Sequence, residues 1–438
     1  MSAQPFDNPD GPKSHVSTMH PPKLALRSLD RLLVSTAAMV LMILYYFWQW
    51  GSVSEFVLAI DHHPQLFQDF LGHYYPMGRS IDEADAPVKG YYYSAFFAVL
   101  LMPFKWLEPV PALWVWGLCQ GVLMLGLSVT ALRLLDPVGR GTAFAFSLLF
   151  WSSFPLIHNA KWGQVSVLLV WLTLMCFDAY RSRKPGLAGA ALAVAAAIKF
   201  YPVVFLAWFM VRRDVRVLAA IAAAMVACYV LVPLAVMGPA QWWNFEMATQ
   251  KSLADAGWAV RDVNSQYIAH VLMRWLSLVD IRLGVAELRW LSAAGYVVFL
   301  SNMVLLWRTR RLQDANDRRW LFGLVLIFLS LPMVIKTSWP HYFVHLAFCQ
   351  MAVILMVRDM ALSSSLRAVV TLLAVVSAAC SSFFVFDCFP GWRPFSQFGM
   401  LFVSNGLLLI AVHLLGWLPL ASPAEGGPGR IGHRLAPR

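Results

Sequence analysis

Long apolar stretches, each about as long as a membrane-spanning helix, alternate with shorter polar segments along most of this chain. The apolar positions are continuous rather than alternating, which favours helices over the strands of a membrane barrel. The pattern therefore predicts an all-α, polytopic membrane protein with about twelve transmembrane helices. The apolar stretches are 32–50, 91–107, 111–135, 142–157, 162–180, 186–211, 217–237, 288–307, 320–337, 340–357, 367–386 and 398–417.

Two polar segments, residues 51–90 and 238–285, are long enough to form structured loops between the apolar stretches. Both combine titratable and aromatic residues, and we expect both on the outer side of the membrane. We assign residues 31–418 to one membrane domain. Residues 1–30 and 419–438 are polar and rich in Pro or Gly, which is typical of disordered tails, here predicted to be cytoplasmic.

The first polar loop contains a periodic segment. Its apolar residues recur at helical spacing from Leu66 to Tyr75, whereas Asp69 and His73 lie on the opposite face. This predicts a short amphipathic helix at the membrane surface that ends at Pro76. Asp69 and His73 are four residues apart, so we expect both side chains to point the same way.

Positive charge predicts the orientation of the chain but leaves two topologies open. The arginines of residues 308–319 mark one loop as cytoplasmic. With one crossing per apolar stretch, the basic residues at 181–184 fall outside, against the positive-inside rule. In the alternative, the stretch 91–107 re-enters the membrane from the outer side and the stretch 186–211 breaks near residues 199–202.

Composition supports the membrane class and excludes others. The chain is 59% hydrophobic and 13% charged. Its formal charge of +11 is explained by cytoplasmic loops, so we expect membrane lipids around the chain and no nucleic-acid partner. The six cysteines form no CxxC pair and are expected to be small hydrophobic residues rather than a zinc site. We predict neither a metal nor a cofactor.

Asp69 is the first candidate for chemistry. On an aromatic-rich helix against the bilayer, its carboxylate loses water, which raises the pKa of a carboxyl group and suits a general base. A solvated, idle carboxylate is the alternative. Asp61 is the nearest competitor for the same role.

Lys199 lies inside an apolar stretch, beside Pro202. A lysine there suits a helix break that faces a cavity, although a snorkelling side chain is the alternative. Its ammonium group is a point charge for a phosphate. Lys161 and Gln164 open another apolar stretch, where polar side chains are costly unless they cap the helix or serve a site.

The outer segments offer groups for sugar recognition. Asn264 and Gln266 have donors and acceptors that suit sugar hydroxyls. His341, between Trp339 and Tyr342, suits a phosphate or a sugar. An ordinary polar loop is the alternative for Asn264 and Gln266, and an interfacial residue without a specific role is the alternative for His341.

Taken in order, these motifs resemble glycosyltransferase family 87, and the resemblance covers about residues 30–415. Two departures stand out: Ser94-Ala95 replaces the double proline of the family, and Asn264-Ser-Gln266 replaces its usual Asn-Gln-Ser order. The matching motifs are Asp69, Tyr74-Tyr75, Gly78-Arg79, the run 91–104, Gly163-Gln164, Lys199-Phe-Tyr-Pro202, Asn264-Ser-Gln266 and Ser338-Trp-Pro-His341.

The resemblance implies a GT-C fold and an inverting transfer of one sugar, most commonly mannose, from a polyprenyl-phosphate donor. It also implies a lipid or glycan acceptor and an active site on the periplasmic side of a bacterial inner membrane. Asp69 is then the catalytic base. The implied ligands of the donor phosphate are Lys199, His341 and Arg79, and the implied substrate contacts are Tyr74, Tyr75, Gln164, Asn264, Gln266 and Trp339.

Other functions fit part of the same pattern. A lipid-linked glycan polymerase or ligase has similar outer loops but moves oligosaccharides. A transporter or flippase is also polytopic, but two corresponding interrupted helices are expected in it, and only one interrupted segment is clear here. A non-catalytic glycan-binding protein needs the loops but not Asp69.

Overall fold

The computed structural model describes residues 26–61, 63, 65–83, 86–136, 139–254, 259–260, 262–314 and 318–417. Within these residues the chain is helical, and an isolated antiparallel β-bridge joins Ser153 to Ser382. The helices are α1 (Ser28–Trp50), α2 (Val53–Ile60), α3 (Tyr75–Ser80), α4 (Ala95–Leu101), α5 (Pro109–Leu135), α6 (Gly139–Trp151), α7 (Phe154–Trp162), α8 (Ser166–Arg181), α9 (Pro185–Ile198), α10 (Leu206–Arg212), α11 (Val215–Met225), α12 (Val232–Met237), α13 (Pro239–Ala254), α14 (Ile268–Ser277), α15 (Val285–Arg308), α16 (Leu321–Val334), α17 (Leu346–Asp359), α18 (Ser364–Ser381), α19 (Phe383–Phe386), α20 (Trp392–Gln397) and α21 (Met400–Gly416).

The prediction of an all-helical, multi-pass membrane protein is confirmed. Seven helical segments of the described chain are long and apolar enough to cross a membrane: Ser28–Trp50, Pro109–Leu135, Val215–Met237, Glu287–Arg308, Pro340–Asp359, Ser364–Ser381 and Trp392–Gly416. The predicted tails lie almost wholly outside the described residues, although α1 already begins at Ser28, inside the first of them. The number of about twelve spans and the GT-C fold stay predictions.

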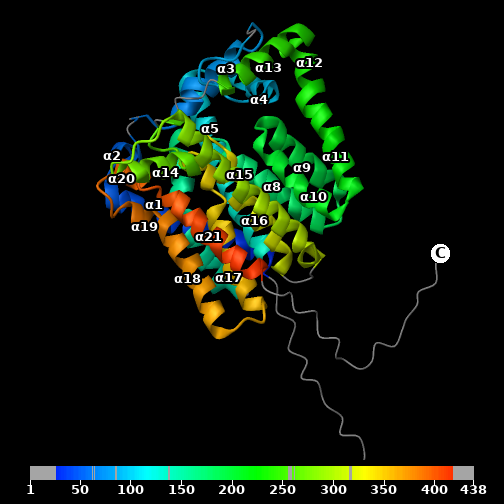
Figure 1. Cartoon of the computed structure of the whole chain (residues 1–438). Helices are drawn as coiled ribbons and strands as arrows, with labels where there is room; N and C mark the ends of the chain where they lie inside the picture. Colours follow the sequence, from blue (N-terminus) through cyan, green and yellow to red (C-terminus); the bar gives the residue numbers. More distant parts are fainter. Residues whose placement is uncertain are drawn as a thin grey trace, which may run out of the picture.

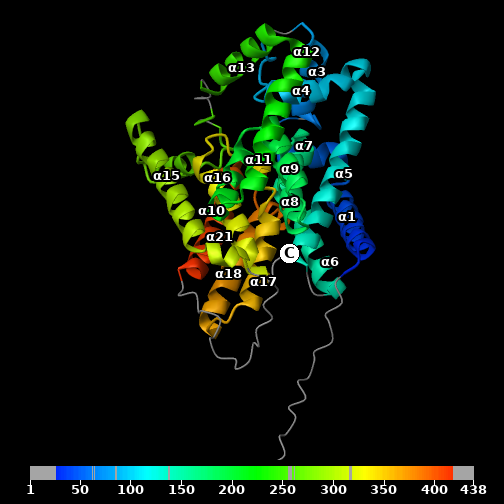
Figure 2. The same ribbon diagram turned by 90° about the vertical axis from the view of Figure 1, so that its right-hand side faces the viewer.

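The helices differ in how much of their surface they bury. Every residue of α16 from Leu321 to Met333 is buried, as expected of a helix that is apolar all round. In contrast, only 17% of an apolar 18-residue stretch of α1 is buried, and the same share applies to the Val215–Met237 segment. Figure 1 and Figure 2 show α16 inside the bundle and α1, α11 and α15 at its periphery.

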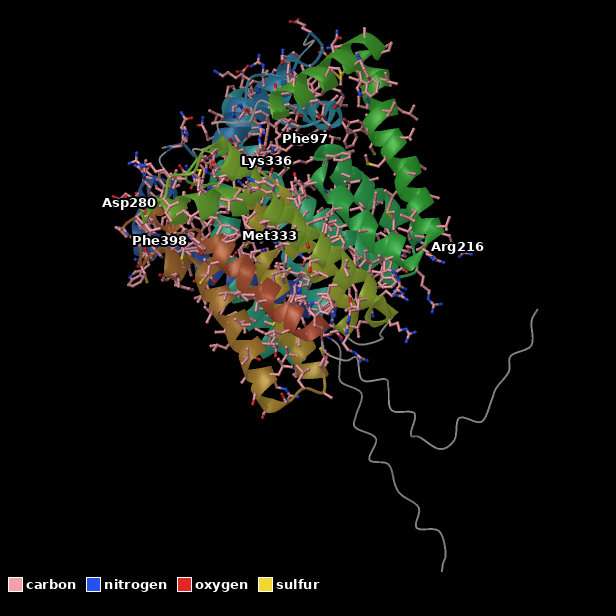
Figure 3. The ribbon with its side chains drawn as sticks, in the orientation of Figure 1. Phe97, Arg216, Asp280, Met333, Lys336 and Phe398 are labelled. Carbon is pink, nitrogen blue, oxygen red and sulfur yellow. The ribbon has the colours of Figure 1, made fainter. Side chains whose placement is uncertain are left out.

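Polar contacts join several helix ends at one end of the molecule, which we call the basic end. Arg31 of α1 lies 3.4 Å from Asp136, directly after α5. Arg318, before α16, bonds to the carbonyl of Leu135 in α5 at 2.7 Å and pairs with Asp359 of α17 at 2.7 Å. The other end carries α3, α4 and α13 (Figure 1), and we call it the cavity end. Figure 3 shows Phe97 and Lys336 towards the cavity end and Arg216 lower, at the start of α11.

The predicted break in the stretch 186–211 is confirmed. α9 ends at Ile198, Lys199 has an extended backbone, and a 3₁₀ turn begins at Tyr201. Pro202 provides a reason, because it has no N–H to donate to the carbonyl of Ile198, four residues before it, and so cannot continue α9.

Both ends of this broken stretch lie at the basic end. Arg181, before α9, lies over the ring of Trp320, with 4.6 Å between its guanidinium carbon and the ring centre. Arg212, at the end of α10, donates to the hydroxyl of Tyr180 at 3.3 Å. The chain therefore turns back at Lys199, which agrees with the second of the two topologies and keeps residues 181–184 on the same side as the other basic residues.

Candidate active site

A cavity of about 570 Å³ lies at the cavity end. It brings together seven of the ten residues that the sequence predicted for the site, although they come from segments far apart in the chain. Its walls are formed by His63, Asp69, His73, Tyr74, Gly90, Tyr92, Tyr93, His158, Trp162, Gln164, Lys199, Leu253, Asp262, Asn264, Thr337, Trp339, His341 and Tyr342.

A short helical segment places Asp69 in the cavity wall. The predicted helix is present, but the prediction that it ends at Pro76 is wrong. The chain passes through a π-helical turn, Phe70–Tyr74, straight into α3, where Pro76 occupies the first turn. Proline is tolerated there because the first N–H groups of a helix have no partner within the helix.

Gly163 holds this segment close to α7. It ends α7 with a left-handed backbone, φ +68°, as glycines at helix ends commonly do. A Cβ atom there would lie 3.2 Å from the Cα of Phe67. Phe67 in turn donates its N–H to the carbonyl of Lys161 at 2.6 Å. The close approach brings Gln164 beside Asp69.

The Asp69 carboxylate is shielded from water, and burial raises its pKa to about 6. His73, Gln164, Lys199 and Lys161 all act in the opposite direction. Gln164 donates its side-chain N–H to the carboxylate, and Nε2 of His73 lies 4.0 Å from Oδ1 of Asp69. The expectation that Asp69 and His73 point the same way is therefore confirmed.

A network of phenols joins Lys199 to Gln164. The hydroxyls of Tyr74 and Tyr93 lie 2.7 Å apart, and both reach Oε1 of Gln164, at 2.9 and 2.8 Å. The Lys199 ammonium donates to Tyr93 at 3.3 Å and lies over the rings of Tyr93 and Tyr342. Since Gln164 uses its oxygen for the tyrosines, its N–H groups face Asp69. A cation and a base thus share one rigid network.

Two histidines lie side by side on another wall. The rings of His158 and His341 are stacked, with 5.6 Å between their centres and 26° between their planes. Both side chains are buried. Among the described residues, Nδ1 of His158 and both ring nitrogens of His341 have no hydrogen-bond partner, whereas Nε2 of His158 lies 3.7 Å from Oδ2 of Asp61. Buried polar groups are normally satisfied, so these nitrogens indicate a place for a ligand.

Asn264 and Trp339 line the cavity but also bond to carboxylates. Asn264 donates to Asp61 at 3.0 Å, and Trp339 donates to Asp262 at 2.6 Å. Asp61 is fully buried and does not line the cavity. Of the two candidate bases, Asp69 is the one that faces the cavity.

Three predicted site residues do not line the cavity. The hydroxyl of Tyr75 donates to the carbonyl of Leu107 at 2.8 Å, and the exposed Arg79 donates to Tyr75 at 3.1 Å. Gln266 donates its side-chain N–H to the carbonyl of Ser396 at 3.1 Å. Arg79 is therefore not placed with Lys199 and His341, because it lies one helical turn beyond Tyr75 on the same face of α3, and neither residue lines the cavity.

Sequence reasoning gave no site role to Tyr93, His158, Trp162 and Asp262. Tyr93 stands in a run of three tyrosines, and His158 is a single histidine at the end of an apolar stretch, so neither carries a distinctive signal. Asp262, two residues before Asn264, belongs to a polar segment that the sequence did single out. Within the described part of the chain, no group of three or more His, Cys, Asp or Glu side chains is arranged to hold a metal ion.

Comparison with known proteins identifies a family that this chain matches. The chain matches glycosyltransferase family 87 over residues 91–337, more than half of its length. The match includes Gln164, Lys199 and Asn264, whereas Asp69 and His341 lie outside it. No solved structure matches the chain significantly.

Two curated relatives are similar over part of their length. Both are described as polyprenol-phosphate-mannose-dependent alpha-(1-2)-phosphatidylinositol mannoside mannosyltransferases. The Mycolicibacterium smegmatis protein is 30% identical over 200 residues, 43% of this chain and 41% of that protein. The Mycobacterium tuberculosis protein is 28% identical over 275 residues, 58% of this chain and 59% of that protein. The matches therefore span less than two thirds of either relative.

Proposed function

The chain belongs to glycosyltransferase family 87, and from this premise we propose that it transfers one sugar from a polyprenyl-phosphate donor to a lipid or glycan acceptor. The names of both relatives contain a polyprenol-phosphate-mannose donor and a phosphatidylinositol mannoside acceptor. They support mannose as the first donor sugar to test and a glycolipid as the first acceptor.

The observation that carries this proposal is that Asp69, a carboxylate with a raised pKa, lines the same cavity as Lys199 and His341. The ring nitrogens of His341 have no hydrogen-bond partner in the described chain. A base whose pKa is near the working pH accepts a proton well and is still ionised at neutral pH. Asp69 takes the proton of an acceptor hydroxyl while that oxygen forms a bond to the anomeric carbon of the donor.

The bond between the anomeric carbon and the phosphate oxygen breaks in the same step. Its electron pair leaves with the polyprenyl phosphate, and the attack from the opposite face inverts the anomeric carbon. Lys199 and His341 stabilise the charge that develops on the leaving phosphate, which fixed cations and donors do well in a shielded cavity.

The distribution of charge supports an outward-facing site. The basic end collects Arg31, Arg181, Arg212 and Arg318, and positive residues mark the cytoplasmic side of a membrane protein. The cavity end then faces the periplasm of a bacterial inner membrane. In this orientation we expect about twelve membrane helices in a GT-C arrangement, of which α9 and α10 are two half-length helices that enter from the basic end and meet at Lys199 without crossing the bilayer.

Sugar transfer by the full chain in lipid nanodiscs tests the proposal. Polyprenyl phosphates carrying radiolabelled mannose, arabinose or glucose are incubated with a membrane glycolipid extract and with wild type, Asp69→Asn or Asp82→Asn. Asp82 is a matched control because it pairs with Lys105 at 2.7 Å and does not line the cavity. We expect transfer by wild type and the control, and none by Asp69→Asn.

The outcome separates the alternatives. Transfer that persists in Asp69→Asn would show that another group is the base. A labelled product that grows by whole oligosaccharides would replace the proposal with a polymerase or ligase. Movement of the donor across the bilayer without any new glycosidic bond would replace it with a transporter or flippase.

A further inference from the structure

A row of four rings forms one wall of the cavity, in the order Trp162, His158, His341, Trp339. The ring centres of neighbours lie 6.0, 5.6 and 6.1 Å apart, and the planes are inclined by 30° or less. The row is built from two elements, α7 and the segment after α16, so its arrangement is a product of tertiary packing. Two imidazoles between two indoles are unusual for a purely apolar wall.

A carboxylate faces this row from behind. Oδ2 of Asp61 lies 3.7 Å from Nε2 of His158, and both side chains are at most 4% exposed. Asp61 also accepts a hydrogen bond from Asn264, whose own oxygen accepts from Ser396 at 2.7 Å. The chain Ser396–Asn264–Asp61 therefore fixes the carboxylate, and the carboxylate in turn fixes the side of His158 that carries Nε2.

We propose that Asp61 is a positioning residue, and that His158, oriented by it, forms with His341 a paired-imidazole subsite for the phosphate of the polyprenyl-phosphate donor. The inference rests on the proposed function, which assigned His341 alone to the phosphate. Nε2 of His158 faces Asp61, so Nδ1 is the nitrogen that contacts the ligand. The phosphate then lies against the nitrogen-bearing edges of the two stacked imidazoles, on the side of Lys199, and all three residues line the cavity.

The surroundings of His158 make its charge depend on the ligand. Burial and Lys161 oppose a proton on His158 and lower its pKa, whereas Asp61 and Asp262 act in the opposite direction. Beside His341 the charged groups are His158 and Lys199. A bound phosphate adds negative charge beside both histidines, which stabilises their protonated forms. Binding is therefore coupled to the uptake of a proton by the histidine pair. Binding of the lipid phosphate therefore strengthens as pH falls.

The test uses a short-chain polyprenyl methyl phosphate, a phosphodiester that carries no sugar and, like the donor, has no proton that titrates in the range used. Its binding to the full chain in nanodiscs is measured from about pH 5.5 to 8.5, the range in which histidine titrates. We expect wild-type affinity to rise as pH falls. His158→Gln and Asp61→Asn should lose most of this rise and bind roughly tenfold more weakly at the acidic end, the effect of one pKa unit. The wild-type slope is the informative readout, since a purely structural defect weakens binding equally at every pH.

His345→Gln is the matched control. His345 is as buried as His158 and bonds to the carbonyl of Tyr342 at 3.0 Å, but it does not line the cavity. We expect its pH slope to equal that of wild type. If His158→Gln does not fold, as judged by its thermal unfolding, the nearly isosteric Asp61→Asn decides.

The result distinguishes this inference from the proposed function. Unchanged pH slopes in both His158→Gln and Asp61→Asn would overturn the paired-imidazole subsite, even if sugar transfer is measured. A wild-type chain that binds the lipid phosphate with the expected slope, but transfers no sugar, would support the subsite and refute the transferase.

Discussion

Asp69 and Asp61 stand eight positions apart in the same polar loop, yet their surroundings differ. Asp69 lines the cavity, accepts a side-chain hydrogen bond from Gln164 and has a pKa of about 6. Asp61 is fully buried, accepts from Asn264 and faces His158. A carboxylate that is enclosed and already engaged orients its neighbours, whereas one that faces a cavity with little solvation is available for a proton. The difference separates the base from its support.

The largest effect should come from Asp69→Asn, and Asp61→Asn is the variant to compare it with. Loss of a general base lowers kcat by about 10³-fold, which we expect for Asp69→Asn. For Asp61→Asn we expect kcat and the donor KM to change by no more than roughly tenfold, the worth of about one charge-assisted hydrogen bond. Initial rates of labelled sugar transfer measure both. Equal losses in the two variants would remove the distinction drawn between them.

Lys199→Gln should have the next largest effect. The ammonium group stabilises charge on the departing phosphate, and removal of one such group costs about 10²-fold in rate. A single-turnover measurement reports the chemical step directly. Lys105→Gln, on an ion pair outside the cavity, should leave the rate unchanged, and a rate of Lys199→Gln close to wild type would place the phosphate elsewhere.

Gln164→Leu should move the pH dependence of transfer. The base acts when ionised, so the wild-type rate should fall as pH drops below about 6. The hydrogen bond from Gln164 lowers the pKa of Asp69, and its removal raises that pKa. The fall should therefore begin at a higher pH in Gln164→Leu, whereas Gln241→Leu, which removes a hydrogen bond to the carbonyl of Ile81, should keep the wild-type profile. A profile that does not move would dissociate Gln164 from the base.

Asp262→Asn should have the smallest effect. Asp262 accepts from the indole N–H of Trp339 at 2.6 Å, so the change loosens a ring in the cavity wall without touching the base. We expect substrate KM to rise a few-fold, about the worth of one weakened hydrogen bond, with kcat unchanged. Steady-state kinetics separate the two parameters, and a lower kcat at constant KM would give Asp262 a role in the chemical step.

Part of this site could be predicted because some of its residues are energetically costly in an apolar stretch of the sequence. Lys199 in an apolar stretch, Pro202 beside it and Gln164 at the membrane edge each need a cavity or a partner, and the structure has both. The role expected for Arg79 depends on which way the face of α3 turns, which is set by the π-helical turn before it. The role expected for Gln266 depends on the loop before α14, where its side chain bonds to Ser396. The role proposed for His158 depends on its contacts with Asp61 and His341, two residues remote in the sequence. Contacts of this kind leave no local pattern in the sequence.

The turn at Lys199 also makes access of the lipid phosphate to its site depend on bilayer thickness. The 14 residues of α9 rise about 21 Å from the basic end, whereas the hydrocarbon layer is about 30 Å thick. If the basic end is anchored at the inner headgroups, the ammonium group is sunk roughly 9 Å beneath the outer edge of that layer. In a thinner membrane the outer headgroups would lie closer to the depth of Lys199. In a thicker membrane each lipid phosphate would have to move further from water to reach the lysine. The acyl-chain length of the host membrane thereby becomes a determinant of how readily the donor reaches its site.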